Sequence, residues 1–105
     1  MKKNQAFKFG LNNHVIDLIQ KVFSNYSQVE KVIIYGSRAK GTYKNGSDID
    51  LTLIGNNIDL NILNQISLDL DDLILPYTFD LSIYRFIDNP DMISHIQRVG
   101  KHFYG

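Results

Sequence analysis

The sequence predicts a single α/β domain, in which about three main strands of a mixed (α+β) sheet are flanked by helices. Short apolar runs of strand length alternate with longer segments whose apolar residues recur every three or four positions. Glycine, proline and asparagine lie between these segments and predict turns. The length of 105 residues suits one hydrophobic core, so residues 1–105 are expected to form one domain.

The first half of the chain is expected to form a helix and two strands. The helix should begin near Asn12 or Asn13, whose side chains can cap it. Its apolar stripe comprises Val15, Leu18, Ile19, Val22 and Phe23. The first strand is expected over roughly Lys31 to Tyr35, before a turn and a short helix, and the second over roughly Asp48 to Ile54.

The second half is expected to contain two helices with a strand between them. The first helix should run from about Asp59 to Leu73 and end before Pro76. Its expected inward residues are Leu60, Leu63, Ile66, Leu70 and Leu73. The third strand falls within Tyr77 to Tyr84, where apolar and polar residues alternate. The last helix should begin at Asn89-Pro90-Asp91 and turn Met92, Ile93, Ile96 and Val99 inward.

Composition narrows the possible functions. The formal net charge is zero, so no overall basic excess favours non-specific nucleic-acid binding. Without cysteine the chain has no disulfide or thiolate metal site. No apolar run reaches transmembrane length, and Met1 to Asn4 shows no signal-peptide pattern, so a cytoplasmic location is expected.

The most informative stretch is Gly36-Ser37, followed after ten residues by Asp48-Ile49-Asp50. Gly36 ends an apolar strand and permits close approach to its backbone, while Ser37 offers a hydroxyl and an N–H to a phosphate. Asp48 and Asp50 lie at i and i+2, so a strand projects both from one face. Paired carboxylates suit Mg²⁺, which prefers oxygen ligands completed by phosphates and waters.

Asp80 is the best candidate for a third acidic ligand or base. Within its strand, Thr78, Asp80 and Ser82 share the polar face. Two-metal phosphoryl transfer needs such a group near the attacking hydroxyl. Three converging carboxylates also predict that at least one pKa is raised when no metal is bound.

The remaining charged and aromatic residues have more ordinary explanations. Arg38 and Lys40 could each face phosphate or solvent, whereas Lys44 is expected to be a solvated loop residue. His14, His95 and His102 have no metal-ligand spacing and are expected to be surface or structural residues. The segment Arg98 to Tyr104 is expected to pack its aromatic rings on the domain, although it could touch a nucleobase or a partner.

The glycine turn and the three aspartates described above give the sequence a resemblance to the DNA polymerase beta superfamily of nucleotidyltransferases, and within it to the minimal nucleotidyltransferases. The resemblance rests on three segments and spans nearly the whole chain. They are Tyr35-Gly36-Ser37-Arg38-Ala39-Lys40-Gly41, Ser47-Asp48-Ile49-Asp50-Leu51 and Phe79-Asp80-Leu81. Each pattern alone is common, since Gly-Ser is usually a turn and Asp-x-Asp usually a solvated face, but one site explains all three.

The resemblance implies a polymerase-beta-like domain whose catalytic and metal-binding residues are Asp48, Asp50 and Asp80. Two Mg²⁺ ions would be cofactors and ATP the substrate, with nucleotide bound by Gly36, Ser37, Arg38 and Lys40. Minimal nucleotidyltransferases are typically paired with a helical HEPN protein. The pairs resemble toxin–antitoxin modules, in which AMP is transferred from ATP to a tyrosine of the HEPN toxin.

Two other functions stay open on the sequence. One is nucleotidyl transfer to an RNA end or a small molecule, and the other is a non-catalytic subunit that neutralises a partner by occlusion. The zero net charge gives no support to an RNA acceptor. Three repelling acids on one face argue against an idle domain. A pocket for the acceptor is expected to need a second polypeptide or self-association.

Overall fold

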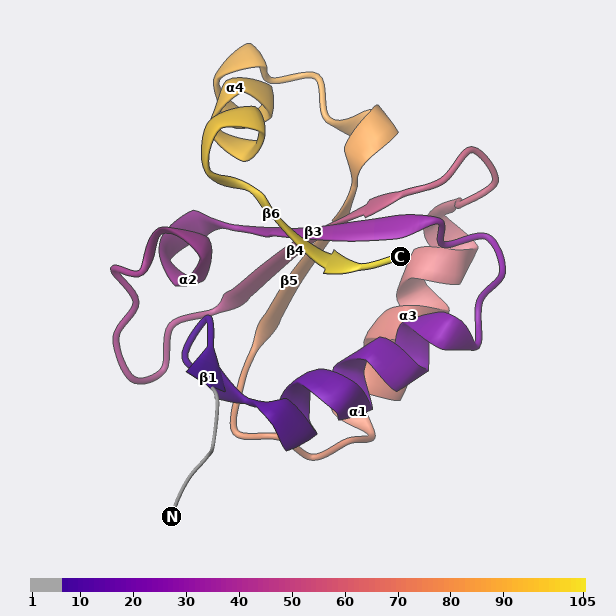
Figure 1. The fold of residues 1–105 in the computed structure, drawn as a ribbon. Helices are drawn as coiled ribbons and strands as arrows, with labels where there is room; N and C mark the ends of the chain where they lie inside the picture. Colours follow the sequence, from indigo (N-terminus) through magenta and orange to yellow (C-terminus); the bar gives the residue numbers. More distant parts are fainter. Residues whose placement is uncertain (1–6) are drawn as a thin grey trace.

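A four-stranded sheet forms the centre of the protein, as the computed structural model shows for residues 7–105 (Figure 1). Its strands are β3 (Lys31–Tyr35), β4 (Ile49–Ile54), β5 (Phe79–Ile83) and β6 (Lys101–Tyr104), in the order β5-β4-β3-β6. β4 and β5 are parallel, whereas β3 is antiparallel to both β4 and β6. The sheet is therefore mixed, as the sequence predicts.

Four α-helices and one 3-10 helix accompany the sheet in this part of the chain. They are α1 (Asn13–Ser24), α2 (Gly36–Lys40), α3 (Leu60–Asp71), η1 (Tyr84–Phe86) and α4 (Pro90–Val99). Side-chain caps fix the starts of the three longer helices. Asn12 accepts from the Val15 N–H and Asp59 from the Ile62 N–H, each at 2.9 Å, and Asn89 accepts from the N–H groups of Asp91 and Met92.

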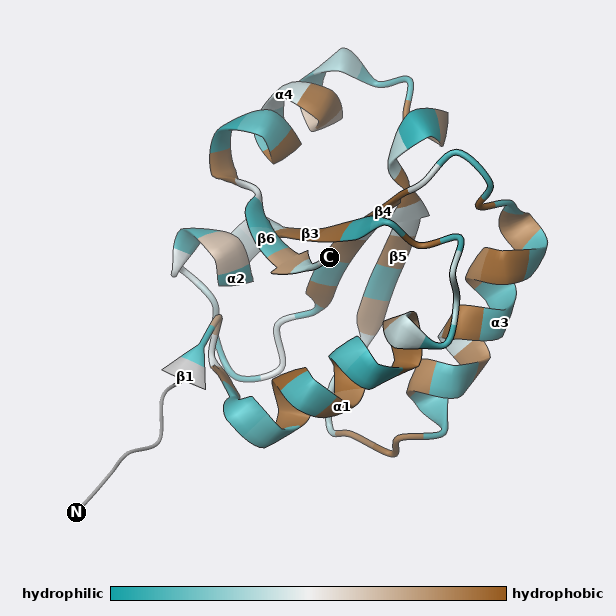
Figure 2. Cartoon of the chain, turned by 45° about the vertical axis from the view of Figure 1, so that its right-hand side comes forward, coloured by the Kyte–Doolittle hydropathy of each residue, from teal (hydrophilic) through white to brown (hydrophobic). Residues whose placement is uncertain are grey.

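The helices cover the two faces of the sheet unequally. In Figure 1, α1 and α3 lie together on one side of the sheet and α4 on the other. Figure 2 shows alternating hydrophobic and hydrophilic bands along α1 and α3, as expected of helices with one buried face. The core lies under α1 and α3 and includes Phe23, Ile34, Leu51, Ile66 and Leu70. On the opposite face α4 packs against β3, and its Ile96 is buried there.

The strand β6 is the main departure from the sequence-based expectation. The segment after α4 packs its aromatic rings on the domain as expected, but it also forms a strand that pairs antiparallel with β3, which was not expected. Phe103 is buried and meets the Phe23 ring edge-on, at 6.4 Å between centroids. Because the pairing joins residues about seventy positions apart and β6 has only four residues, local sequence patterns gave no signal for it.

Smaller differences concern the N-terminus and the helix faces. A two-stranded hairpin, β1 (Phe7–Lys8) with β2 (Leu11–Asn12), precedes α1. Leu60 and Met92, both expected to face inward, are 61% and 39% exposed because they lie at the first turns of their helices, near solvent. The prediction of no signal-peptide pattern at Met1 to Asn4 falls outside the described residues.

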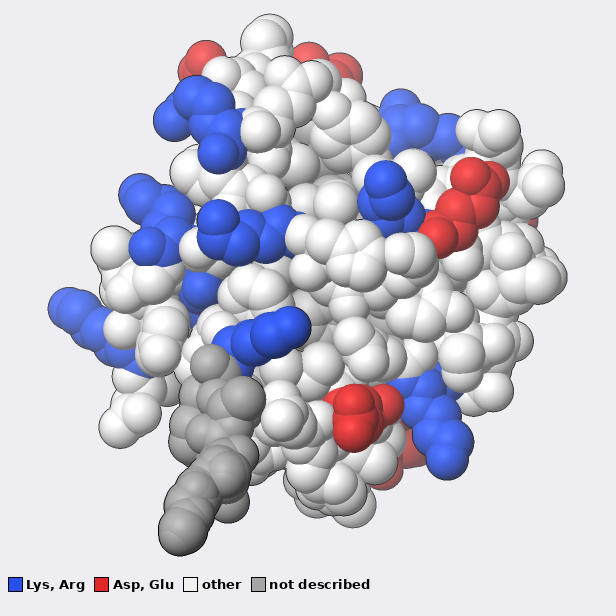
Figure 3. Space-filling model, viewed as in Figure 1, with Lys and Arg blue, Asp and Glu red and all other residues white. Residues whose placement is uncertain are grey.

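Charge is unevenly distributed over the surface although the net charge is zero. On the face shown in Figure 3, Lys and Arg side chains gather toward the left, while acidic side chains lie toward the top, right and bottom. None of the helices in residues 7–105 combines the length and apolar character needed to cross a bilayer.

Replacing Phe103 with alanine tests whether β6 belongs to the folded core. The change removes a ring that is only 3% exposed, so we expect the free energy of unfolding to fall by about 3–4 kcal/mol. Urea denaturation measures this loss. Phe86→Ala, at a site 49% exposed, is the matched control and should cost about 1 kcal/mol or less. Equal small losses in both variants would contradict the packing of β6.

Candidate active site

Polar side chains form cross-strand pairs along one face of β4 and β5. The parallel register places Asp50 beside Asp80 and Thr52 beside Ser82. The Ser82 hydroxyl donates to the Thr52 hydroxyl at 2.9 Å. One step before β4, Asp48 accepts a hydrogen bond from the Thr78 hydroxyl. Three polar pairs therefore follow one another, and the two acidic positions of the Asp-x-Asp pattern share this face.

The buried side of β4 holds this register. Ile49, Leu51 and Leu53 alternate with the polar residues and are fully buried. A slip of one residue would turn Asp50 into the apolar core, where an unpaired carboxylate is strongly disfavoured. The hydrophobic alternation thus fixes which way the acidic side chains point.

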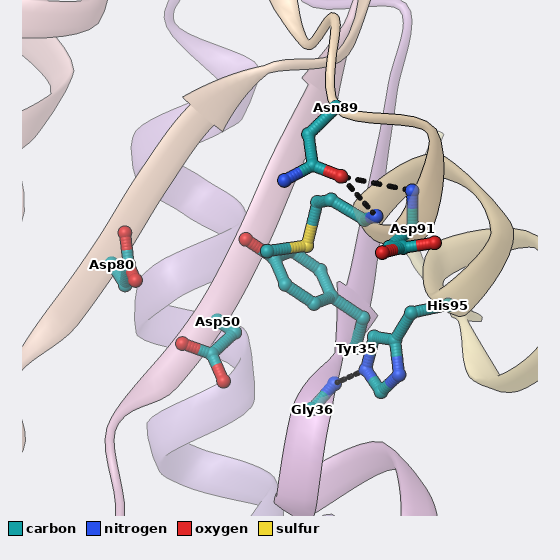
Figure 4. A pocket seen from close by; sticks show the side chains of 8 residues that line it. Tyr35, Gly36, Asp50, Asp80, Asn89, Asp91 and His95 are labelled. Carbon is teal, nitrogen blue, oxygen red and sulfur yellow. Dashed lines mark hydrogen bonds between the residues drawn. The ribbon is translucent and has the colours of Figure 1, made fainter.

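A cavity of about 480 Å³ opens above Asp50 and Asp80 (Figure 4). It is lined by Tyr35, Gly36, Asp50, Asp80, Asn89, Asp91, Met92 and His95. The sheet supplies one wall through β3, β4 and β5, and the first turns of α4 supply the other. The cavity is therefore assembled from segments distant in sequence.

Gly36 lies directly against the carboxylate of Asp50. Its φ of 71° is in the left-handed region, which favours glycine. A Cβ at this position would overlap the Asp50 Oδ2 atom. The glycine that ends β3 is thus required both by its backbone conformation and by the close approach of the acid.

The Asp50 carboxyl has a pKa well above its usual value. Burial, followed by the negative charges of Asp80 and Asp48, raises the pKa of Asp50 from 3.8 to about 6, while Arg38 acts in the opposite direction. The raised pKa agrees with the expectation from clustered acids. Burial rather than mutual repulsion is its largest cause.

Tyr35 lines the same cavity as the Asp50 carboxyl. It is 6% exposed, and burial raises the pKa of its hydroxyl, with smaller contributions in the same direction from Asp80 and Asp50 and an opposing one from a hydrogen bond with Ser82. Its ring meets the His95 ring edge-on, at 6.0 Å between centroids. Tyr35 remains neutral near pH 7 and packs the strand end against α4.

The first turns of α4 contribute residues that the sequence analysis named but did not assign to the site. His95 accepts a hydrogen bond from the Gly36 N–H at its Nε2 atom, at 3.2 Å. Asn89, Asp91 and Met92 line the same wall. The cap at Asn89 was predicted, but only the packing of α4 against the sheet shows that its first turns face the acids, so spacing alone could not reveal this wall.

The predicted site residues fall into two groups. Asp50, Asp80 and Gly36 line the cavity, with Asp48 beside them on Thr78. The others, Ser37, Arg38 and Lys40, lie on α2 and do not line it.

Arg38 is held within the protein. Its side chain is 3% exposed, and its guanidinium donates to the carbonyl oxygens of Phe9 and Ser47. The centroids of the Tyr43 and Tyr77 rings lie 5.4 and 5.1 Å from the Arg38 Cζ atom. In this structure Arg38 joins the N-terminal hairpin to the loop before β4, whereas Lys40 is exposed.

The acidic residues fit a magnesium site only in part. Within residues 7–105, no three acidic, histidine or cysteine side chains are close enough together to hold a metal ion. Asp50 and Asp80 nevertheless face one cavity from adjacent strands, and Mg²⁺ takes one or two carboxylates when phosphates and waters complete its shell. Thr78 engages Oδ1 of Asp48, which leaves Oδ2 for a ligand role. The donor set therefore suits magnesium bound together with a nucleotide.

The fold and site define a small mixed-sheet domain with paired acids beside a glycine turn, which is the arrangement of a nucleotidyltransferase. The family described as "Polymerase beta, Nucleotidyltransferase" matches residues 17–105. The chain belongs to this family. No sequence among curated proteins matches it.

Solved structures share the fold at low sequence identity. A toxin–antitoxin complex with AMP-PNP is 21% identical with a TM-score of 0.70, over 86% of this chain and 73% of that chain. The complex of the tri-AMPylated Shewanella oneidensis HEPN toxin with the MNT antitoxin is 17% identical with a TM-score of 0.64, over 88% and 71%. The toxin–antitoxin MntA-HepT is 17% identical with a TM-score of 0.63, over the same shares.

Gly36→Ala tests the contact between the glycine turn and Asp50. The added methyl group meets both the left-handed backbone and the carboxylate, so we expect stability to fall by about 2 kcal/mol and nucleotidyl transfer by at least about a hundredfold. Gly41→Ala is the matched control, since φ is 84° there and no atom lies within 4 Å of the added group. It should cost about 1 kcal/mol and leave transfer intact. Similar transfer rates in the two variants would contradict the contact.

The raised pKa of Asp50 predicts a distinct pH dependence of stability without metal. Between about pH 4 and pH 6 the folded protein keeps a proton on Asp50 that the unfolded chain has lost. The free energy of unfolding contributed by Asp50 therefore falls as pH rises through this window. Asp50→Asn should be increasingly more stable than the wild type from pH 4 to pH 6, with a constant difference above pH 7.

Urea denaturation from pH 4 to pH 8 in EDTA measures this difference. Asp17→Asn, at an exposed position of α1, is the matched control. A difference between Asp50→Asn and the wild type that does not vary with pH would show that the pKa of Asp50 is not raised.

Proposed function

We propose that this protein is a Mg²⁺-dependent nucleotidyltransferase that transfers AMP from ATP to a tyrosine hydroxyl of a cognate HEPN-family toxin. The observation that carries the proposal is the paired Asp50 and Asp80 beside Gly36, in a cavity of a polymerase beta family domain. The structural neighbours that contain AMP-PNP or an AMPylated HEPN toxin support the choice of nucleotide and partner.

Each acid has a role in the proposed reaction. Asp48 and Asp50 would hold the ion that accompanies the triphosphate, and with Asp80 they would hold a second ion near the acceptor. When bound, the ions neutralise the triphosphate and favour loss of the hydroxyl proton. Asp80 is exposed at the cavity and is placed to accept this proton directly or to act only as a ligand.

The glycine turn orients the nucleotide in this proposal. Gly36 and Ser37 position the β and γ phosphates, and Lys40 supplies an exposed cation on the same short helix. The Arg38 guanidinium already donates to two carbonyl groups, so its contribution is to hold the loop and to act through its charge on Asp50. The acceptor oxygen attacks the α-phosphorus in line, the bond to the bridging oxygen breaks, and pyrophosphate leaves.

The partner supplies the acceptor. The wall of the cavity formed by α4 is open to solvent at Asp91 and Met92, so a tyrosine of a second protein could reach Asp80. We therefore propose a hetero-oligomer with a helical HEPN protein, located in the cytoplasm, with no direct role for nucleic acid. Transfer to an RNA end, transfer to a small molecule and inhibition by occlusion are the alternative outcomes of the test.

The decisive experiment combines the purified protein with Mg²⁺ and α-labelled ATP, alone and with the product of the adjacent gene. We expect the partner's intact mass to rise by one or more AMP units, with the label on tyrosine. Asp50→Asn and Asp80→Asn should each lower the rate by at least about a thousandfold, because each removes a charge that acts in the transition state.

Circular dichroism of each variant is the control that checks whether it remains folded. A tight complex without AMP transfer would contradict the proposed enzymatic function and favour a non-catalytic subunit that inhibits its partner by occlusion. Near-normal transfer by Asp50→Asn would exclude the proposed site.

A further inference from the structure

One hydrogen bond joins the two walls of the cavity. His95 on α4 accepts from the backbone N–H of Gly36, which lies 59 positions earlier in the chain. Figure 4 shows the imidazole reaching Gly36 from α4, while Asp50 and Asp80 project from the neighbouring strands. The contact lies where β3 ends and α2 begins.

The acceptor role fixes the state of the imidazole. Nε2 must be unprotonated to accept the N–H, so the neutral ring carries its proton on Nδ1. Without this acceptor, the Gly36 N–H would be one of the donors that a first helical turn leaves unpaired. The side chain thus satisfies a backbone group that nothing within α2 can satisfy.

Gly36 has little freedom to move in the opposite direction. The carboxylate of Asp50 fills the space where a side chain would be, and φ is fixed in the left-handed region. His95 therefore holds the turn from one side while Asp50 limits it from the other. The Tyr35 ring, in edge contact with His95, supports the imidazole from β3.

α4 is anchored well enough to act as a support. Ile96, next to His95, is 4% exposed, and α4 packs against both α2 and β3. The backbone from which the His95 side chain projects is therefore held in place by the packing of the helix.

We propose that His95 is a positioning residue for nucleotide binding, which fixes the Gly36-Ser37 turn so that it meets the triphosphate beside Asp50. This inference rests on the proposed nucleotidyl transfer. His95 acts through the turn. Its removal affects the binding of ATP more than the subsequent chemistry or the binding of the acceptor protein.

Two substitutions separate the acceptor atom from the volume of the ring. His95→Phe keeps an aromatic ring without an acceptor, and we expect the KM for ATP to rise about five- to tenfold, as for loss of one hydrogen bond. kcat and the KM for the acceptor protein should change less than about twofold. His95→Gln, whose Oε1 can accept from Gly36, should return the KM for ATP to within about twofold of the wild type.

His14→Phe is the matched control, because His14 is exposed on α1 on the other side of the sheet and undergoes the same chemical change. It should leave all three constants unchanged. An unchanged or lower KM for ATP in His95→Phe would overturn the inference, as would equal defects in His95→Phe and His95→Gln.

Hydrogen exchange of the Gly36 amide, followed by NMR, provides a test that does not need a folded His95→Phe variant. Protection in the wild type and in His95→Gln supports the inference, whereas rapid exchange in the wild type overturns it. A wild-type protein that transfers no AMP to any acceptor would overturn the proposed function. Transfer that is insensitive to His95→Phe would overturn this inference alone.

Discussion

The register between β4 and β5 is the constraint on which the site depends. It places Asp50 beside Asp80, and the same ladder continues to Thr52 and Ser82. Three fully buried aliphatic side chains on the other side of β4 hold that register by the hydrophobic effect. The energy that keeps two mutually repelling acids together thus comes from the core beneath α1 and α3, and not from the acids themselves.

The raised pKa of Asp50 shows that the ionised carboxylate lowers the stability of the folded protein. A half-buried carboxylate next to two others is less favourable in the folded protein than in the unfolded chain. Such a cost is common where a charged ligand will later be bound, since the ligand then relieves it. The cavity is accordingly acidic, and the buried Arg38 offsets only part of its charge.

The glycine turn and α4 complete the site from opposite sides. Gly36 comes close enough to Asp50 to exclude any side chain, and its N–H is taken by His95. The turn is therefore defined by contacts with β4 and α4 as much as by its own sequence. The end of β3, the short helix α2 and the C-terminal helix α4 therefore form one site.

Much of the fold and the acidic centre could be predicted because the signals are local. A short apolar run predicted β3, while alternation of apolar and polar residues predicted β4 and β5 and placed Asp50 and Asp80 on their polar faces. The asparagine and aspartate caps marked the helix starts. Spacing did not separate Arg38 from Lys40, since burial of one and exposure of the other depend on the N-terminal hairpin and the loop before β4.

The sequence by itself determined the class of fold, the glycine turn and the acidic positions, because each follows from a short periodic pattern or from the conformational freedom of one residue. Only the tertiary structure decided that the C-terminal segment pairs with β3, that Asp48 is held by Thr78, and that His95 contacts Gly36. These contacts join residues 30 to about 70 positions apart. They form when the core brings the elements together, so no local pattern encodes them.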